Sequence, residues 1–235
     1  MSALVEINNI CKIYNPGENE VRALDHVSVS IDEGEFVAII GQSGSGKSTL
    51  MNMLGCLDVP TSGEYRLHGQ NVSELTDNEL SDIRNREIGF IFQGFNLIAN
   101  LTALENVELP LIYRGVPRGE RVRLARTALE KVGLGKRIEH KPAEMSGGQQ
   151  QRVAIARAIA QAPPIILADE PTGNLDSRST EEIMAILQEL YEEGRTVILI
   201  THNNEIADRA KRIIQIKDGK IESDTRGGKA VGTEK

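Results

Sequence analysis

The sequence contains no tryptophan, and aromatic residues make up only 3% of the chain. This leaves few platforms on which the bases of single-stranded nucleic acid could stack. Basic residues do not compensate, because 27 Lys and Arg stand against 34 Asp and Glu, giving a net charge of −7. The composition therefore provides no global positive field that attracts nucleic acid, and we expect no nucleic-acid partner.

Cysteines are scarce, and long apolar runs are missing. Cys11 and Cys56 lie far apart without metal-ligand spacing, so we expect buried, reduced thiols. No stretch approaches the about 18 apolar residues that a membrane-spanning helix needs. The first residues lack the basic and apolar regions of a secretory signal. We therefore expect a soluble, cytoplasmic protein whose membrane role, if any, depends on a partner.

Short apolar runs alternate with amphipathic stretches, a pattern typical of an α/β fold. Strands are expected at Val27–Ile31, Phe36–Ile40, Ile88–Phe92, Ile165–Ala168 and Thr196–Ile200, with a closing hairpin of Arg212–Ile216 and Lys220–Glu222 around Asp218-Gly219. Helices are expected at Lys47–Leu57, Leu101–Tyr113, Arg118–Val132, Ser146–Ala160 and Glu181–Glu193. In the first helix, the expected buried side carries Leu50, Met53, Leu54 and Leu57.

The order of these elements predicts one domain, residues 1–222, with a helical insertion. The catalytic α/β core is expected over about 1–94 and 162–222, and the helical subdomain over about 95–161. Residues 223–235 are rich in Gly, Lys and Thr with hardly any apolar residues, which predicts a loose, flexible tail.

A glycine-rich segment, Gly41-Gln-Ser-Gly-Ser-Gly-Lys-Ser48, lies between the expected strand Phe36–Ile40 and the following helix. This pattern in this setting is typical of a phosphate-binding loop. Glycines let backbone N–H groups turn inward around phosphates, and the helix presents its unpaired N–H groups and positive dipole end to the same anion. Lys47 is expected to reach the β- and γ-phosphates, and Ser48 to offer its hydroxyl to Mg²⁺. ATPases, GTPases, kinases and motors share such a loop.

Two acids, Asp169 and Glu170, directly follow the apolar run Ile165–Ala168. At the carboxyl end of a parallel sheet they would face the ligand crevice beside the phosphate loop. Asp169 suits the Mg²⁺ shell, directly or through water, and Glu170 is the candidate to orient and deprotonate the attacking water. A strand that merely ends in polar residues before Pro171 is the alternative, and the phosphate loop favours the functional interpretation.

The segment Met145-Ser-Gly-Gly-Gln-Gln-Gln-Arg152 resembles the signature of ABC ATPases, usually Leu-Ser-Gly-Gly-Gln, with Met145 in place of Leu. Met keeps the volume and apolarity of Leu. Ser146 can cap the helix that starts there, while the two glycines leave N–H groups open to an anion. The resemblance implies a P-loop NTPase core with a parallel sheet, an N-terminal antiparallel β subdomain and an inserted helical subdomain. It also implies ATP and Mg²⁺ as cofactors.

Other motifs extend the resemblance, in the same order, over nearly the whole chain. The resemblance implies that Tyr14 stacks on adenine and that His202 contacts the γ-phosphate. It also implies that Gln93 contacts the γ-phosphate and Mg²⁺ and transmits their presence to the helical insertion. Asn174-Leu-Asp176 matches a loop that crosses a dimer interface, although an Asx residue there can simply cap the next helix. Asn203-Asn204 follows His202 where many relatives carry Asp, so the role of that acid has no support here.

The expected site residues fall into four groups by role. The catalytic residues are Glu170, His202 and Lys47. The ATP-binding residues are Tyr14, Gly41, Ser43, Gly44, Ser45, Gly46, Lys47, Ser48, Thr49 and Gln93. The residues of the signature expected to act on the partner's ATP are Ser146, Gly147, Gly148 and Gln149, and Asp176 is the residue of the dimer loop. The metal ligands are Ser48, Gln93 and Asp169.

The resemblance is strongest to the macrolide-export and lipoprotein-release group of ABC ATPases. It rests on Asn52–Asp58, Asn96–Leu97, Leu101–Leu111 and Leu167–Asp176. Members of this group work with membrane subunits in the export or extrusion of drugs, peptides or lipoproteins. The resemblance implies a head-to-tail homodimer in the ATP-bound state, an integral membrane permease subunit and a periplasmic or extracytoplasmic adaptor. The chain would then be peripheral on the inner face of the cell membrane.

Other function classes remain as alternatives. A soluble ABC ATPase acting on nucleic acid or the ribosome usually has two cassettes or a long coiled-coil insertion, whereas this chain has one cassette, no heptad array and an acidic balance. A GTPase or small-molecule kinase would share the phosphate loop. However, no Asn-Lys-x-Asp run that reads guanine occurs, and a helical insertion separates Lys47 from Asp169. Glu170 argues against a binding module that never hydrolyses its nucleotide.

Overall fold

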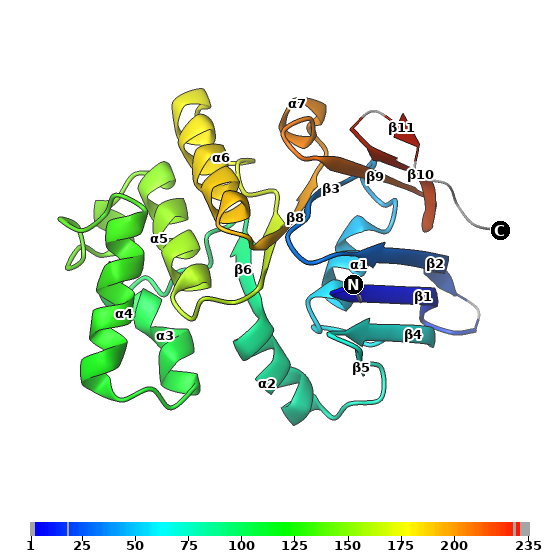
Figure 1. Cartoon of the computed structure of the whole chain (residues 1–235), viewed down its shortest axis with the longest axis horizontal. Coiled ribbons are helices and arrows are strands. Elements are labelled where there is room, and N and C mark those ends of the chain that lie inside the picture. Colours follow the sequence, from blue (N-terminus) through cyan, green and yellow to red (C-terminus); the bar gives the residue numbers. More distant parts are fainter. Residues whose placement is uncertain (1–2, 18, 228, 231–235) are drawn as a thin grey trace. The chain divides into compact units, whose positions relative to one another are not determined.

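The structure is a computed structural model, and it describes residues 3–17, 19–227 and 229–230 (Figure 1). The chain divides into two compact units. Unit 1 contains the chain up to Ile83 and from Thr196 onward, and unit 2 is Arg84–Arg195. The predicted subdomain boundaries, near residues 95 and 162, differ from these divisions and stay a prediction.

Unit 1 contains strands in two groups. The first is antiparallel, with the order β2-β1-β4-β5, and consists of β1 (Val5–Tyr14), β2 (Val21–Ile31), β4 (Ser62–Leu67) and β5 (Gln70–Asn71). The second has the order β11-β10-β9-β3-β8 and consists of β3 (Phe36–Ile40), β8 (Thr196–Thr201), β9 (Arg212–Lys217), β10 (Lys220–Arg226) and β11 (Lys229–Ala230). Strand β3 runs parallel to both β8 and β9. The two groups bear out the antiparallel β subdomain and the parallel core of the α/β prediction.

The helices of unit 1 are α1 (Lys47–Leu54), the first part of α2 (Asp77–Glu87) and the short α7 (Asn204–Ala207). The predicted first helix was too long at its end, because Gly55 ends α1 and Cys56 has a φ of 52°. Leu57 is consequently 47% exposed rather than on the buried side, while Leu50, Met53 and Leu54 are buried as predicted. The fully buried Tyr65 of β4 donates its hydroxyl to the Leu54 carbonyl at 2.9 Å and ties the end of α1 to the sheet.

Unit 2 combines two parallel strands, β6 (Ile88–Phe92) and β7 (Ile165–Asp169), with helices. The helices are the end of α2, α3 (Ala103–Tyr113), α4 (Arg118–Lys131), a 3₁₀ turn at Pro142–Glu144, α5 (Gly147–Ile159) and α6 (Ser177–Glu192). Figure 1 shows α3, α4 and α5 beside one another in green. No helix in the described part of the chain is both long and apolar enough to span a bilayer.

Two further predicted boundaries are wrong for identifiable physical reasons, and the strand predicted at Val27–Ile31 begins earlier, at Val21. Helix α6 begins at Ser177 rather than Glu181, because Asp176 caps it through the Ser179 N–H. The tail is shorter than predicted, because β10 continues through Arg226 and pairs with β9. Polar residues form β10 through ion pairs rather than apolar burial, so composition alone indicated a loop. Residues 231–235 of the predicted tail lie outside the described residues.

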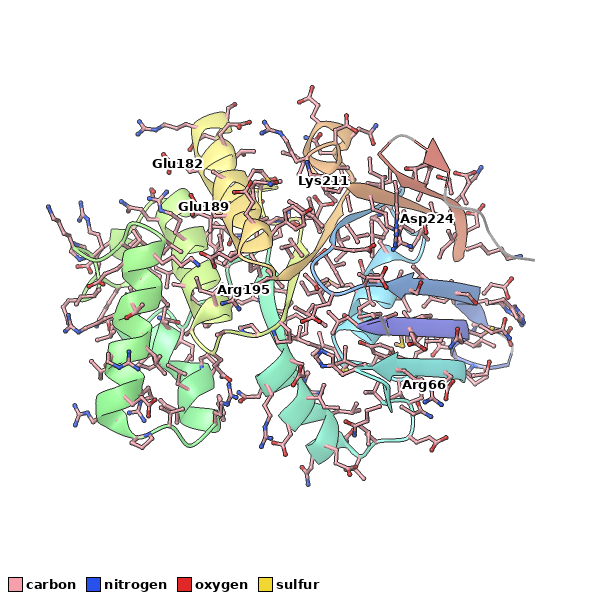
Figure 2. All side chains as sticks on the ribbon, in the orientation of Figure 1. Arg66, Glu182, Glu189, Arg195, Lys211 and Asp224 are labelled. Carbon is pink, nitrogen blue, oxygen red and sulfur yellow. The ribbon has the colours of Figure 1, made fainter. Side chains whose placement is uncertain are left out.

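A buried guanidinium holds these polar strands together. Arg212 at the start of β9 has a side chain only 5% exposed. Its Nε and Nη2 donate to the two carboxylate oxygens of Asp224 at 2.8 and 2.6 Å (Figure 2 labels Asp224). Its Nη1 donates to Glu35 Oε2 and to the Ser30 carbonyl, both at 2.8 Å. One cation thus links β9 and β10 to β2 and the turn before β3.

Replacing Arg212 by Ala should destabilise the protein by about 3–5 kcal/mol, because Asp224 would keep its buried charge without a partner. Glu35 is less affected, since Arg226 Nη2 lies 2.5 Å from its other oxygen. Arg212→Lys should cost less, because it keeps the charge but loses the bidentate geometry. Urea denaturation measures both variants. A loss of less than about 1 kcal/mol for Arg212→Ala, the range of an exposed ion pair, would contradict this account.

Candidate functional site

The predicted phosphate loop runs from the end of β3 to the start of α1 in unit 1. Its backbone needs glycine at Gly46, which has a φ of 103°. A Cβ built at this position would lie 2.5 Å from the Ala23 carbonyl oxygen, so a larger residue would displace β2. The side chain of Ser45 is buried, and its Oγ has no hydrogen-bond partner among the described residues. The loop is therefore tightly fitted against its own sheet and retains an unpaired hydroxyl.

The helix that follows the loop begins without a side-chain cap. Gly46 occupies the N-cap position of α1 and has no side chain to bond the first N–H groups. Helices α3, α5 and α6, by contrast, are capped by Thr102, Ser146 and Asp176. The first turn of α1 therefore presents unpaired N–H groups and the positive end of the helix dipole, as anion binding requires.

Lys47 lies inside the curve of this loop. Its Nζ donates to the carbonyl oxygens of Gly41 and Gln42, both at 2.7 Å. An ammonium group has three donors, so one more bond is possible without breaking these two. Ser48 is exposed in the first turn of α1, where its hydroxyl can accept or coordinate. The loop, Lys47 and Ser48 thus form a site for a negatively charged ligand.

Tyr14, the predicted adenine-stacking residue, ends β1 and is half-buried. Its hydroxyl donates to Asp58 Oδ2 at 3.0 Å, and Lys12 Nζ lies 5.1 Å from the ring centroid. Burial and the Asp58 contact raise the pKa of the Tyr14 hydroxyl, so it stays a protonated donor. Val21 pairs directly with Tyr14 across β1 and β2 and is 55% exposed. Side chains of directly opposed residues share a face, so Val21 adds apolar surface beside the ring.

His202, the predicted γ-phosphate contact, directly follows β8 and is exposed. The next residue, Asn203, caps α7 by accepting from the N–H groups of Glu205 and Ile206 at 2.9 and 3.4 Å. The Asn203 N–H in turn donates to Thr201 Oγ1 at 3.1 Å. His202 is therefore held between two fixed residues, and Asn at position 203 supplies the cap that an Asp would give.

The two predicted acids lie in unit 2 at the end of β7. Asp169 is the last residue of the strand, and both acids are half-buried. Glu170 has a φ of 44°, which is unusual for a residue with a side chain and costs of order 1–3 kcal/mol. Its carbonyl accepts from the Gly173 N–H at 3.0 Å. Such strain is characteristic of residues that are held in position for a function.

Gln93, which follows β6, is exposed and contacts the loop after Glu170. The Gln93 amide nitrogen lies 3.5 Å from Asn174 Oδ1, and Asn174 Nδ2 donates to the Gln93 carbonyl at 3.1 Å. A Cβ on Gly173 would lie 2.6 Å from the Gln93 amide nitrogen. The amide oxygen of Gln93 makes none of these contacts and can accept a bond or coordinate a cation. The structure thus brings Gln93 together with the predicted dimer loop.

The predicted signature opens α5, which begins at Gly147. Ser146 Oγ accepts from the Gln149 N–H at 3.3 Å, and Gln149 Oε1 accepts from the Ser146 N–H at 3.0 Å. This capping box leaves the N–H groups of Gly147 and Gly148 without an intrahelical partner. Met145 is 8% exposed, as expected for an apolar substitute for Leu.

Asp176, predicted as a dimer-loop residue, caps α6 beside this helix start. Its carboxylate accepts from the N–H and the hydroxyl of Ser179 at 2.8 and 3.0 Å, and these bonds lower its pKa. A Cβ on Gly148 would lie 2.5 Å from Ser179 Oγ. The starts of α5 and α6 are thus in direct contact. Asp176 caps α6, as the alternative interpretation predicted, and the cap is compatible with a second role in a dimer interface.

Two residues of α5 that the sequence did not indicate hold the loop that contains Gln93. Gln151 is fully buried, and its Nε2 donates to the Pro171 carbonyl at 2.7 Å and, more weakly, to the Phe92 carbonyl at 3.4 Å. Arg157 donates to the carbonyls of Phe95 and Asn96 at 2.9 and 2.5 Å, and burial lowers its pKa. Both of these carbonyls belong to residues with positive φ. Helix α5 therefore bonds the backbone on both sides of Gln93 and stabilises the unusual conformation of Phe95 and Asn96.

The predicted residues thus fall into two internally connected sets. Unit 1 holds Tyr14, the phosphate loop with Thr49, and His202. Unit 2 holds Gln93, the signature, Asp169, Glu170 and Asp176. Sequence reasoning missed Val21 and Arg157, and it included Gln151 and Asp58 only as parts of the segments Met145–Arg152 and Asn52–Asp58. The signal that could have indicated Val21 is an apolar residue directly after a polar stretch, at the start of β2.

The sequence profile of the ABC transporter family matches residues 24–173. The chain belongs to this family. It is 55% identical over 98% of its length to the macrolide export ATP-binding/permease protein MacB of Hyphomonas neptunium, but spans only 36% of that protein. It is 54% identical to an uncharacterized ABC transporter ATP-binding protein of Thermotoga maritima, covering 99% of both chains.

Solved structures of the family have the same fold. A dimeric, post-hydrolysis structure of the ATP-binding cassette MJ0796 with ADP and Pi has a TM-score of 0.87 and 50% identity, covering 95% of this chain and 98% of that one. A second dimeric structure of the same cassette gives the same values. The chain is an ABC-type ATPase. The predicted P-loop NTPase fold and ATP as its nucleotide are thereby confirmed, with Mg²⁺ as the metal of this family.

Gly148→Ala tests the contact between the starts of α5 and α6. The new Cβ would also lie 2.8 Å from Ser179 Cβ, so rotating the Ser179 hydroxyl cannot relieve the clash. We expect a loss of about 1–3 kcal/mol in unfolding free energy, together with a lower ATPase rate.

Gly119→Ala in α4 is the matched control. A Cβ there meets nothing within 4 Å, so this variant should be neutral or gain up to about 1 kcal/mol. Equal stability of the two variants in chemical denaturation would contradict the predicted clash.

Gln151→Met tests whether α5 positions the loop after Glu170. Met has a similar volume without the donor, and it also removes Gln151 Oε1, a buried acceptor that lacks a partner among the described residues. Stability should therefore change by less than about 1.5 kcal/mol, whereas kcat should fall about 10-fold or more because the Pro171 carbonyl is released. Steady-state ATPase assays that give an unchanged kcat would refute this role.

Proposed function

We propose that this chain is the ATP-hydrolysing subunit of an ABC transporter that binds Mg-ATP at the interface of a head-to-tail dimer. The observation that carries the proposal is the glycine loop 41–46, which leads into a helix without a side-chain cap. A triphosphate satisfies both the unpaired N–H groups and the Lys47 ammonium. The half-exposed ring of Tyr14, with Val21 beside it, offers a flat apolar surface for adenine.

The chemistry of each predicted metal ligand suits magnesium. Ser48 offers a hydroxyl, Gln93 an amide oxygen and Asp169 a carboxylate, which are the hard oxygen ligands that Mg²⁺ prefers. A bound Mg²⁺ would supply positive charge against the charge that develops on the phosphate oxygens. The buried cysteines, by contrast, are soft ligands and take no part.

Hydrolysis then depends on three groups of this chain. Glu170 accepts the proton of the attacking water and orients it, with the strained backbone fixing the carboxylate. Lys47 stabilises negative charge on the γ-phosphate from inside the loop. His202 donates to the same phosphate from the end of β8. Since transition-state stabilisation of this kind depends on positioning, the fixed neighbours of Glu170 and His202 support these roles.

The signature residues act on the ATP of a second copy. The start of α5 offers the N–H groups of Gly147 and Gly148 and the Ser146 hydroxyl, and Asp176 lies beside them. In a head-to-tail dimer, the N–H groups of Gly147 and Gly148 and the Ser146 hydroxyl bind the γ-phosphate held by the partner's phosphate loop, while Asp176 belongs to the loop at the interface. ATP is thus a component of the interface, and its hydrolysis opens the dimer. The dimeric structures of the similar cassette MJ0796 support this arrangement.

The proposed membrane partner is an integral permease subunit. The macrolide export relative combines ATP-binding and permease in its name, and this chain spans 36% of it. We propose export or extrusion of drugs, peptides or lipoproteins, with a periplasmic or extracytoplasmic adaptor, from the cytoplasmic face of the cell membrane. None of the relatives named above has a name that points to nucleic acid or the ribosome, so that alternative gains no support.

Glu170→Gln tests the catalytic and dimer proposals together. The amide cannot accept the water proton, so the ATPase rate should fall by about 100-fold or more while ATP still binds. The variant should then accumulate as a dimer with Mg-ATP, which size-exclusion chromatography with light scattering measures. Glu189→Gln is the matched control, since this carboxylate is exposed on α6 (Figure 2).

The outcomes separate the two parts of the proposal. A Glu170→Gln variant that stays monomeric at saturating ATP would refute the ATP-sandwich dimer. Normal turnover in that variant would refute Glu170 as the base. The Glu189→Gln control should match the parent protein in both assays.

A further inference from the structure

The carboxylate of Asp58 lies at the centre of a hydrogen-bond cluster on the proposed base-binding side of unit 1. Its Oδ1 accepts from Lys12 Nζ at 2.6 Å and from the Val59 N–H at 2.8 Å. Its Oδ2 accepts from the Tyr14 hydroxyl at 3.0 Å. Burial alone would raise the pKa of Asp58, but the bonds from Lys12, Val59 and Tyr14 outweigh it and lower the pKa. The group is therefore a charged acceptor with both oxygens in use.

Asp58 is fixed to the phosphate-loop helix by the backbone. The N–H groups of Leu57 and Asp58 both donate to the Asn52 carbonyl in α1, at 2.8 and 3.2 Å. Tyr14 is thus connected through the Asp58 side chain to the helix that begins at the phosphate loop. Its position relative to the proposed phosphate site depends on these bonds.

The same cluster determines how the Tyr14 ring is presented. A half-buried tyrosine at the end of a strand would otherwise change rotamer easily, and binding a base would then have to order it. The bond to Asp58 fixes the hydroxyl end, and Lys12 Nζ, itself bonded to Asp58, lies 5.1 Å from the ring centroid. Lys12 can therefore attract the ring electrostatically and helps to hold it in one orientation.

From this geometry we infer that Asp58 is a positioning residue for nucleotide-base recognition, which presents the Tyr14 ring in its binding orientation relative to the phosphate loop. This inference rests on the proposed function, in which Tyr14 stacks on adenine. Asp58 does not touch the nucleotide in this scheme. It acts through Tyr14, so its loss should weaken the binding of ligands that have a base and leave the binding of bare phosphates unchanged.

The test compares Mg-ATP with Mg-tripolyphosphate, which has the three phosphates but no base, by isothermal titration calorimetry. Asp58→Ala should weaken ATP binding about 3- to 10-fold, because a misplaced ring loses part of the binding free energy of a base–aromatic stack. The affinity for tripolyphosphate should change by less than about 2-fold, or about 0.4 kcal/mol, because this ligand has no base for Tyr14 to contact. Asp58→Asn retains an oxygen that can accept from Tyr14 and should lose less than Asp58→Ala.

Tyr14→Phe provides a second, independent variant. It keeps the ring but removes the hydroxyl, so it should weaken ATP binding to a similar degree as Asp58→Ala. The double variant should be no weaker than either single one, because both remove the same bond. This non-additivity distinguishes positioning from a general effect on folding.

Glu64→Ala is the matched control. Glu64 belongs to the same sheet and also bonds a cation, with Arg66 Nη2 donating to Oε1 at 2.7 Å (Figure 2 labels Arg66). This control should bind both ligands like the parent protein.

Three results would overturn the inference. Asp58→Ala could bind ATP normally, it could weaken both ligands equally, or its effect could add fully to that of Tyr14→Phe. A parent protein that binds ATP no more tightly than tripolyphosphate would overturn base recognition itself, and with it this part of the proposed function. If the parent discriminates clearly and Asp58→Ala discriminates to the same degree, only the role of Asp58 is refuted.

Discussion

The start of α1 imposes the constraint on which the predicted site depends. A helix always leaves its first N–H groups without intrahelical partners, and a protein normally satisfies them with a capping side chain. At α1 the cap position is Gly46, whose φ of 103° and close approach to the Ala23 carbonyl exclude a side chain. The start of α1 is therefore open to a ligand that can bond these N–H groups. Tyr14, Lys47 and Ser48 are arranged around the same helix.

In unit 2, by contrast, the starts of α5 and α6 are capped by side chains. Ser146 and Asp176 cap adjacent helices, and Gly148 allows these starts to touch. Farther along α5, Gln151 and Arg157 bond backbone carbonyls on both sides of Gln93. A shift of α5 would therefore change the loop of Gln93 as well as the signature. This shared support gives a physical basis for coupled movement of the two motifs.

The sequence predicted the elements and motifs that depend on local spacing. The strand Phe36–Ile40, the helix capped by Ser146 and the turn at Asp218-Gly219 are all present, the last with both residues at positive φ. It failed where partners lie far apart in the chain. Arg212 stabilises the polar strand β10 through Asp224 and Glu35, and no local pattern indicates this. Likewise, the partners of Asp58 and Gln151 are separated from them by long stretches of sequence.

The cap at Asn203 has a consequence for how the protein responds to acid. An aspartate in this position would become protonated as the pH falls, and its hydrogen bonds to the start of α7 would weaken. The amide of Asn203 does not titrate, so its bonds to the Glu205 and Ile206 N–H groups persist. The hydrogen bonds that cap α7 after His202 therefore do not weaken as the pH falls.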